Sequence, residues 1–240
     1  MVDRRDIFRA LSASAIALAA SSRPGFAEED GDLSSGSGSM TDFFHQDLPD
    51  LPEASEGEIE VVLTGYDHGT RPALLIHNAT DKTIGVKEVT GIATLDDGTQ
   101  LETLGYATIA PDELPPGGYA MGVSRLEDSI PADAEAEFEF EFITYEPGDG
   151  PMPNVEVPVI EIEIDSDSII GRVENTKDVA ASELAAVVGL FFGSEGDIVG
   201  WFYSYLAGDV DPGETGRFSR REFFGEITDS YAFAASGPAG

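Results

Sequence analysis

The sequence predicts an all-β protein with two tandem antiparallel β-sandwich domains, which follow a signal peptide and a flexible acidic linker. Three observations lead to this prediction. Short runs of β-branched and aromatic residues recur between Gly, Pro and Asp turns, and no stretch keeps an apolar stripe of helical spacing over a full helix length. One order of turn residues also occurs twice along the chain.

The N-terminus has the layout of an export signal. A basic start with Arg4 and Arg5 precedes residues 10–20, which contain only Ala, Leu, Ser and Ile. Eleven helical residues would rise about 17 Å, short of the roughly 30 Å hydrocarbon core of a bilayer. We therefore expect residues 1–27 to form a signal peptide, and we expect no membrane span in the mature chain. Arg4 and Arg5 resemble the twin-arginine export motif, which implies an extracytoplasmic location: secreted, periplasmic or on the cell surface.

The charge balance and the lack of cysteine exclude several classes of protein. The 240 residues include 46 Asp and Glu, 13 Lys and Arg and no Cys, with a net charge of −33. Removal of residues 1–27 takes away two acids and four bases, which leaves 44 acids, 9 bases and a net charge of −35. Such a surface opposes nucleic acids, whose phosphates must be met by cations. It is typical either of proteins from salt-loving organisms or of acidic secreted proteins.

Two segments of biased composition divide the chain. Residues 28–57 are rich in Glu, Asp, Ser, Gly and Pro, which predicts a disordered acidic tether. Residues 147–153 hold three Pro and two Gly, which predicts an interdomain linker. We therefore expect a first sandwich at 58–146 and a second at 154–236.

The two predicted domains share turn residues at nearly constant spacing. Asn78 and Asn175 are 97 positions apart, Gly98 and Gly196 are 98 apart, and Gly117 and Gly213 are 96 apart, each of this last pair directly after Pro. An Asn side chain supports a turn through hydrogen bonds to the backbone, and Gly supplies the left-handed conformation. The spacing predicts a duplicated unit.

Residues 137–142 carry a strand pattern of period two. Aromatic rings at 138, 140 and 142 alternate with carboxylates at 137, 139 and 141. The rings should face a core and the carboxylates should face solvent. Six or seven such strands in about 90 residues predict a two-sheet sandwich like the immunoglobulin architecture.

The second domain resembles FxLYD-type exported β-sandwich domains of bacteria and archaea. The residues that carry this resemblance are Gly171 to Asn175, Val188 to Phe192 with Gly196, and Pro212-Gly213. The first domain is similar through Asn78, residues 95–98 and Pro116-Gly117, so the resemblance covers roughly residues 58–236. It implies two tandem extracytoplasmic modules with no catalytic residues to carry over.

The candidate metal ligands are acidic residues in turns. Asp96 and Asp97 form one pair, and Asp165 and Asp167 form another. Hard carboxylate oxygens at turns suit calcium, although no EF-hand spacing is present. The alternative is a pair of solvated acidic loops. We expect no other cofactor, because phosphate-loop and dinucleotide fingerprints are both missing.

The chain has three histidines, His45, His68 and His77. A Ser-His-Asp triad would need an activated serine, and the sequence has no Gly-x-Ser-x-Gly elbow. A metal site that uses His68 or His77 stays open as an alternative to ordinary turn and surface histidines.

An aromatic run at 198–206 is the candidate partner-binding segment. Period two puts Trp201, Tyr203 and Tyr205 on one strand face, with Phe202 on the other. These three rings could form a surface patch for a protein or glycan. Alternatively, they could pack into the sandwich or against the first domain.

Together these features predict an exported, non-catalytic protein that acts as an interaction or envelope scaffold module for an unknown protein or cell-envelope partner. Two other functions stay open. One is a calcium-dependent adhesin-like module, and the other is a small hydrolase or redox accessory protein that uses His68 or His77.

Overall fold

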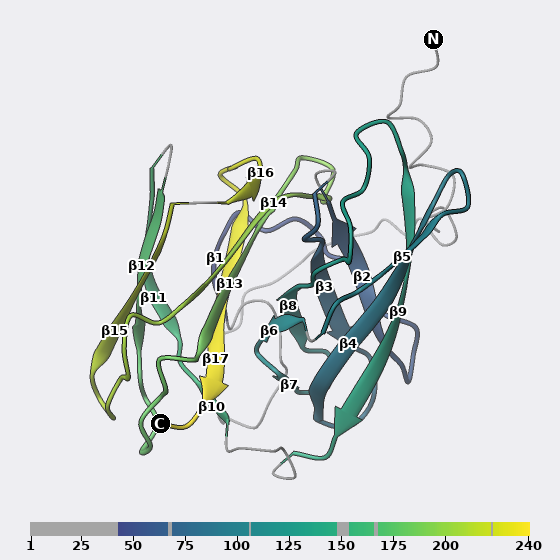
Figure 1. The fold of residues 1–240 in the computed structure, drawn as a ribbon. Helices are drawn as coiled ribbons and strands as arrows, with labels where there is room; N and C mark the ends of the chain where they lie inside the picture. Colours follow the sequence, from purple (N-terminus) through teal and green to yellow (C-terminus); the bar gives the residue numbers. More distant parts are fainter. Residues whose placement is uncertain (1–42, 67–68, 106, 148–153, 166–167, 222) are drawn as a thin grey trace, which may run out of the picture. The chain divides into compact units, whose positions relative to one another are not determined.

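All regular elements in the described part of the chain are β-strands, which confirms the all-β prediction. The computed structural model describes residues 43–66, 69–105, 107–147, 154–165, 168–221 and 223–240. None of these residues lies in a helix that could cross a bilayer. By their contacts, the described residues form one unit, which Figure 1 draws as a series of twisted sheets.

The chain up to residue 147 contributes two antiparallel four-stranded sheets. In the first, the strands follow the order β2, β3, β8 and β6. In the second, β4 is central and pairs with β9, β5 and β7. The bounds are β2 Ile59–Gly65, β3 Ala73–Asn78, β4 Ile84–Leu95, β5 Gln100–Glu102, β6 Thr108–Ala110, β7 Glu113–Leu114, β8 Tyr119–Val123 and β9 Ala136–Tyr145.

The later part of the chain, together with β1 from the start of the described residues, forms two more sheets. One holds β11, β12 and β15 in that order. The other holds β1, β17, β13, β14 and β16, with β10 also paired to β17. The bounds are β1 Phe44–Gln46, β10 Asn154–Glu156, β11 Val159–Asp165, β12 Ser168–Glu174, β13 Ala186–Phe192, β14 Ile198–Tyr205, β15 Thr215–Arg220, β16 Phe224–Gly225 and β17 Tyr231–Pro238.

Apolar side chains fill the space between successive sheets. Val187 and Phe191 of β13 belong to the core shared with β11, β12 and β15. Val188 and Leu190, on the other face of β13, share a second core with Leu75 of β3. We call this second core the middle core. The opposite face of β3 packs toward β4 and β9 in a further cluster.

β13 and β3 are therefore buried along their whole length. A strand buried on both faces needs apolar residues at consecutive positions, which explains the unbroken runs at 73–76 and 186–192. The halves that the sequence separates at 147–153 consequently share apolar side chains in the middle core. Residues 148–153 of the predicted linker lie outside the described residues.

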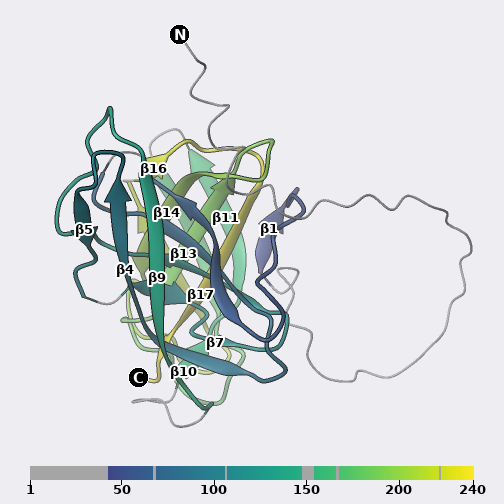
Figure 2. The ribbon, with the colours of Figure 1, turned by 90° about the vertical axis from the view of Figure 1, so that its right-hand side faces the viewer.

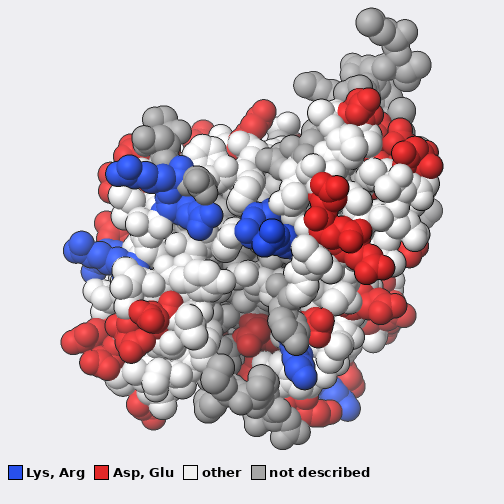
Figure 3. Space-filling view, viewed as in Figure 1, with Lys and Arg blue, Asp and Glu red and all other residues white. Residues whose placement is uncertain are grey.

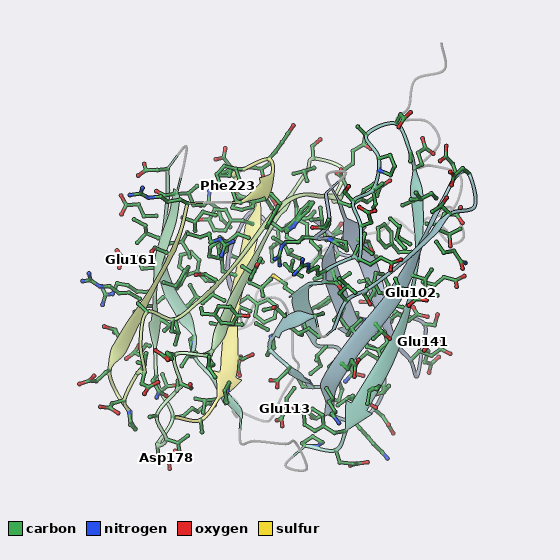
Figure 4. All side chains as sticks on the ribbon, in the orientation of Figure 1. Glu102, Glu113, Glu141, Glu161, Asp178 and Phe223 are labelled. Carbon is green, nitrogen blue, oxygen red and sulfur yellow. The ribbon has the colours of Figure 1, made fainter. Side chains whose placement is uncertain are left out.

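The strand β9 shows the predicted alternation. Phe138, Phe140 and Phe142 are half-buried, whereas the three Glu residues between and before them are exposed. The rings of Phe138 and Phe140 stack with their centroids 5.9 Å apart. Glu141, labelled in Figure 4, lies on the outer side of this strand.

The two predicted asparagine turns have the same hydrogen bonds. Asn78 Nδ2 donates to Leu114 O and Asn175 Nδ2 donates to Val210 O, both at 2.8 Å. Each Nδ2 also donates to the carbonyl four residues later, at 2.8 Å. Each Oδ1 accepts from the backbone N–H two residues later, at 3.0 Å. Both side chains are fully buried, so each amide replaces the backbone partners that the turn lacks.

The paired glycines also match. Gly98 and Gly196 have φ of 84° and 83°, and Gly117 and Gly213 have 72° and 77°. The N–H groups of Gly117 and Gly213 donate to the carbonyls of the two asparagines, each at 2.8 Å. A side chain would be strained at these positive φ values, which explains why Gly recurs at matched positions.

The start of the described chain differs from the prediction. Residues 43–57, expected to belong to a disordered tether, form an ordered segment that we call the strap. Its strand β1 pairs antiparallel with β17, and Phe44 lies opposite Phe233. Figure 2 shows β1 at the edge of this sheet. Leu48 and Leu51 then pack against the middle core. The packing of these apolar residues stabilises the strap despite its acidic and Pro-rich composition. The rest of the predicted tether, 28–42, lies outside the described residues.

Candidate functional site

The predicted calcium ligands do not come together in the described chain. Asp96 and Asp97 lie in the turn between β4 and β5, whereas Asp165 ends β11 in another sheet. Asp97 Oδ1 accepts from Thr99 N at 2.8 Å, and hydrogen bonds from the Thr99 side chain and backbone lower the pKa of Asp97. No group of three or more His, Asp and Glu residues gathers around an ion-sized site within the described ranges. Asp167 lies outside them, as do Arg4 and Arg5 of the export signal.

The three histidines have separate positions. His45 is exposed on β1, His68 lies outside the described residues, and His77 is buried on β3. His77 Nδ1 accepts a hydrogen bond from Ala54 N at 2.8 Å, so the ring fastens the strap to the first sheet. Burial lowers the pKa of His77, against smaller opposing effects of Glu53 and of a hydrogen bond to the Gly117 backbone.

Tyr119 completes this attachment. Its ring lies 4.4 Å from the ring of His77, and its hydroxyl donates to Pro52 O at 3.1 Å. Burial, and then the nearby charge of Glu53, raise the pKa of Tyr119 to about 12. The neutral imidazole and the neutral phenol thus both hold the strap.

The three rings of the predicted aromatic patch differ in solvent exposure. Trp201 is 1% exposed and stacks on Phe224 within the middle core, with ring centroids 5.9 Å apart. Tyr203 is half-buried at the edge of this core, and Tyr205 is 49% exposed. A surface patch that includes Trp201 is therefore wrong, and Trp201 packs inside, as the alternative interpretation expected.

Tyr203 instead lies at the centre of a group of cations that the sequence did not predict. The Arg71 guanidinium carbon lies 5.1 Å from the Tyr203 ring centroid, and that of Arg220 lies 4.9 Å from it. Both distances are within the range of cation–π attraction. Arg71 lies two residues before β3, Tyr203 lies on β14, and Arg220 is the last residue of β15.

Arg125 joins this group through strand register. Ser124 N donates to Pro72 O at 2.9 Å and Leu126 N donates to Thr70 O at 2.8 Å. Arg71 and Arg125 lie between these two bonds, directly opposite each other, so their side chains leave the ladder on the same face. We call Arg71, Arg125, Tyr203 and Arg220 the arginine–tyrosine cluster.

The cluster reverses the sign of charge that prevails elsewhere. The whole chain has 46 acids against 13 bases, yet two guanidinium groups lie over the Tyr203 ring and Arg125 lies opposite one of them, Arg71, in the strand register. In Figure 3, Lys and Arg side chains gather at the upper left and at the centre of the face shown. Asp and Glu predominate on the right-hand side of the same face.

Stacking on an aromatic ring uses only the flat face of a guanidinium, and guanidinium groups bind carboxylates and phosphates through their in-plane N–H groups. The sequence signal for this arrangement is weak, because Arg71 and Tyr203 are 132 positions apart. Only the tertiary packing of the two halves of the chain brings them together.

Comparisons with family models, with curated proteins and with solved structures give no match. The resemblance to FxLYD-type domains therefore depends on the sequence motifs alone.

Proposed function

We propose that this chain is an exported, non-catalytic interaction module that binds an anionic component of the cell envelope. The arginine–tyrosine cluster is the observation that carries the proposal. A cationic site on a chain of net charge −33 selects an anion locally, while the remaining surface repels other polyanions. The export part of the proposal depends on Arg4, Arg5 and the apolar run that follows them.

The middle core supports a scaffold role. Val188 and Leu190 from one half share this core with Leu75 and Met121 from the other. Shared apolar packing opposes independent motion of the two halves. The module would therefore hold its binding face at a fixed position relative to its other surfaces.

The geometry favours this function over the two alternatives. His77, the described histidine of the hydrolase or redox alternative, already accepts a hydrogen bond from Ala54. Asp97, one of the candidate calcium ligands, is already bonded to the Thr99 backbone. Both groups have structural partners that account for their positions.

The test measures location and partner dependence in the producing host. The tagged full chain should reach the extracytoplasmic fraction, and the Arg4→Lys/Arg5→Lys variant should stay in the cytoplasm. A cross-linked envelope component should be lost from Arg71→Glu/Arg220→Glu. Arg217→Glu is the matched control, since Arg217 is exposed on the same strand as Arg220.

Two outcomes would contradict the proposal. Wild-type chain that remains in the cytoplasm would remove the export function. Equal cross-linking of the double variant and the control would remove the arginine–tyrosine cluster as the binding face. Thermal unfolding of each variant separates loss of binding from loss of the fold.

A further inference from the structure

The strand β9 has one hydrogen-bonding edge that no other strand of the described chain occupies. β9 pairs only with β4. Ala136 N donates away from β4, to the Tyr66 hydroxyl at 3.3 Å. Because backbone groups alternate in direction along a strand, the N–H and C=O groups of Phe138 and Phe140 also point away from β4. Within the described ranges, these groups bond to no other backbone group.

The duplicated unit identifies β17 as the counterpart of β9. β17 pairs with β13 as β9 pairs with β4, and both pairings place a glycine opposite a phenylalanine. Gly91 lies opposite Phe140, and Gly189 lies opposite Phe233. A Cβ on either glycine would overlap the opposite ring, so each ring packs over its glycine in the same way. The two strands therefore occupy equivalent positions in the two halves of the chain.

In the second half, a short extended segment covers this edge. β1 pairs antiparallel with β17 and places Phe44 opposite Phe233. Phe44 packs against the core that contains Phe233, and its ring stacks on Tyr231 with centroids 6.4 Å apart. Phe233 is fully buried, whereas its counterpart Phe140 is only half-buried. Within the described chain, β9 therefore lacks the covering strand that its counterpart has.

The neighbouring strand β2 does not fill the position of this missing strand. β2 comes close to β9 as β11 comes close to β17, and β1 occupies the edge of β17 in addition. Figure 2 shows β9 at the front of the view, with β4 to its left. An extended segment can therefore add to β9 in the way that β1 adds to β17.

The side chains of β9 determine which segment fits its edge. Residues opposite each other on antiparallel strands place their side chains on the same face of the sheet. Side chains opposite Phe138 and Phe140 would therefore meet apolar rings, as Phe44 meets Phe233. Side chains opposite the exposed Glu residues at 137, 139 and 141 would meet carboxylates. A matching segment alternates apolar residues with Lys or Arg.

The same carboxylates disfavour a second copy of this chain as the occupant. Two β9 strands paired together would set Glu against Glu, and charged edges of this kind oppose self-association. The strap of another copy, residues 43–57, has acids at 47, 50, 53 and 56 and neither Lys nor Arg. The charge therefore favours a different protein as the partner.

We infer that the free edge of β9 binds an extended segment of a partner protein, in which Lys or Arg alternates with apolar residues, as an added antiparallel strand. Main-chain hydrogen bonds to Phe138 and Phe140 hold the segment, and the row of Glu residues selects its charge. This surface uses no residue of the arginine–tyrosine cluster, so the inference does not depend on the proposed function.

Fluorescence polarisation with three end-blocked peptides and the purified full chain tests the inference. The first peptide is Lys-Phe-Lys-Val-Lys-Phe-Lys. The second contains the same residues in the order Lys-Lys-Lys-Lys-Phe-Val-Phe. The third has the first sequence with N-methyl groups on its apolar residues, which removes the donors that would face β9. At about 0.15 M salt, which screens distant charges, the first peptide should bind at least about tenfold more tightly than either of the others.

Two double variants test the row of Glu residues. Glu139→Lys/Glu141→Lys should weaken binding of the first peptide by at least about tenfold. Glu163→Lys/Glu174→Lys changes the net charge equally at exposed strand positions of the other half, and should weaken it by less than about twofold. Hydrogen exchange locates the peptide: the Phe138 and Phe140 amides should exchange fast in the free chain and at least about tenfold more slowly in the complex.

Each contrary result would overturn the inference. Equal binding of the rearranged peptide would mean that charge alone attracts it, and equal binding of the N-methylated peptide would mean that no strand is added. Failure of the first peptide to bind a wild-type chain that is folded by circular dichroism would be equally decisive. These comparisons use the wild type, so they hold even where a variant fails to fold. A dimer in sedimentation, with the Phe138 and Phe140 amides already protected, would show that a second copy occupies the edge.

Discussion

Replacement of His77 by Phe tests how the strap is fastened. Phe keeps an aromatic ring against Tyr119 but removes the Nδ1 acceptor, which lies 2.8 Å from Ala54 N. An unpaired donor at a part-buried position costs about 1–3 kcal/mol. For a chain of this size, each kcal/mol corresponds to a fall in Tm of about 2–4 °C. Hydrogen exchange at the Ala54 amide should become faster, because its acceptor is removed. The Gly213 amide in the distant asparagine turn should keep its protection from exchange.

The same replacement has a signature in pH. Because burial lowers the pKa of His77, the unfolded state takes up a proton first as the pH falls below 6.5. The contribution of His77 to the free energy of unfolding is therefore complete above 6.5 and declines as the pH falls toward the lowered value. Glu53 opposes this shift, and Glu60 lies opposite His77 on β2, so both charges remain in every variant compared.

Thermal unfolding of wild type and His77→Phe between about pH 5.5 and 8 measures this decline as a difference, which cancels most of the titration of the carboxylates. The two curves should separate most above pH 6.5 and converge below it. His45→Gln is the control, because His45 is exposed on β1. Parallel curves for His77→Phe and wild type, or unchanged exchange at Ala54, would refute the role of His77.

Four further predictions address the core and the charge. Asn175→Ala should lower the free energy of unfolding by about 2–4 kcal/mol in urea, since it removes two buried donations at 2.8 Å; a loss below about 0.5 kcal/mol would contradict this. Gly189→Ala should cost about 1–3 kcal/mol, because its methyl group would overlap the Phe233 ring, whereas Gly208→Ala, with open space, should be nearly neutral. Trp201→Ala should cost about 3–5 kcal/mol, and a near-neutral result would mean that the ring is exposed in solution. Tm should rise markedly from low to molar salt because the net charge is −33, and a flat profile would remove the saline-habitat interpretation.

The parts that the sequence predicts best are those with local causes. The rings of β9 face inward because period two is a property of the strand itself. The two asparagine turns match because short polar side chains and Gly act on their own backbone neighbours. Neither feature needs information about distant residues.

The parts that the sequence misses depend on distant contacts. Composition at 43–57 indicates a tether, yet Phe44 pairs with Phe233 and Leu51 reaches the middle core. The interior position of Trp201 depends on a sheet from the other half of the chain. The arginine–tyrosine cluster needs three strands to meet, so no local pattern could reveal it.

The middle core has a consequence for how this chain could be inherited or engineered. Leu75 and Met121 on one side of it, and Val188 and Leu190 on the other, exclude water from each other. A truncation near residue 147 would expose the apolar surfaces of the middle core to solvent. The separated halves should then associate or aggregate. A chimaera that exchanges one half must therefore keep the side chains that face the other half in the middle core.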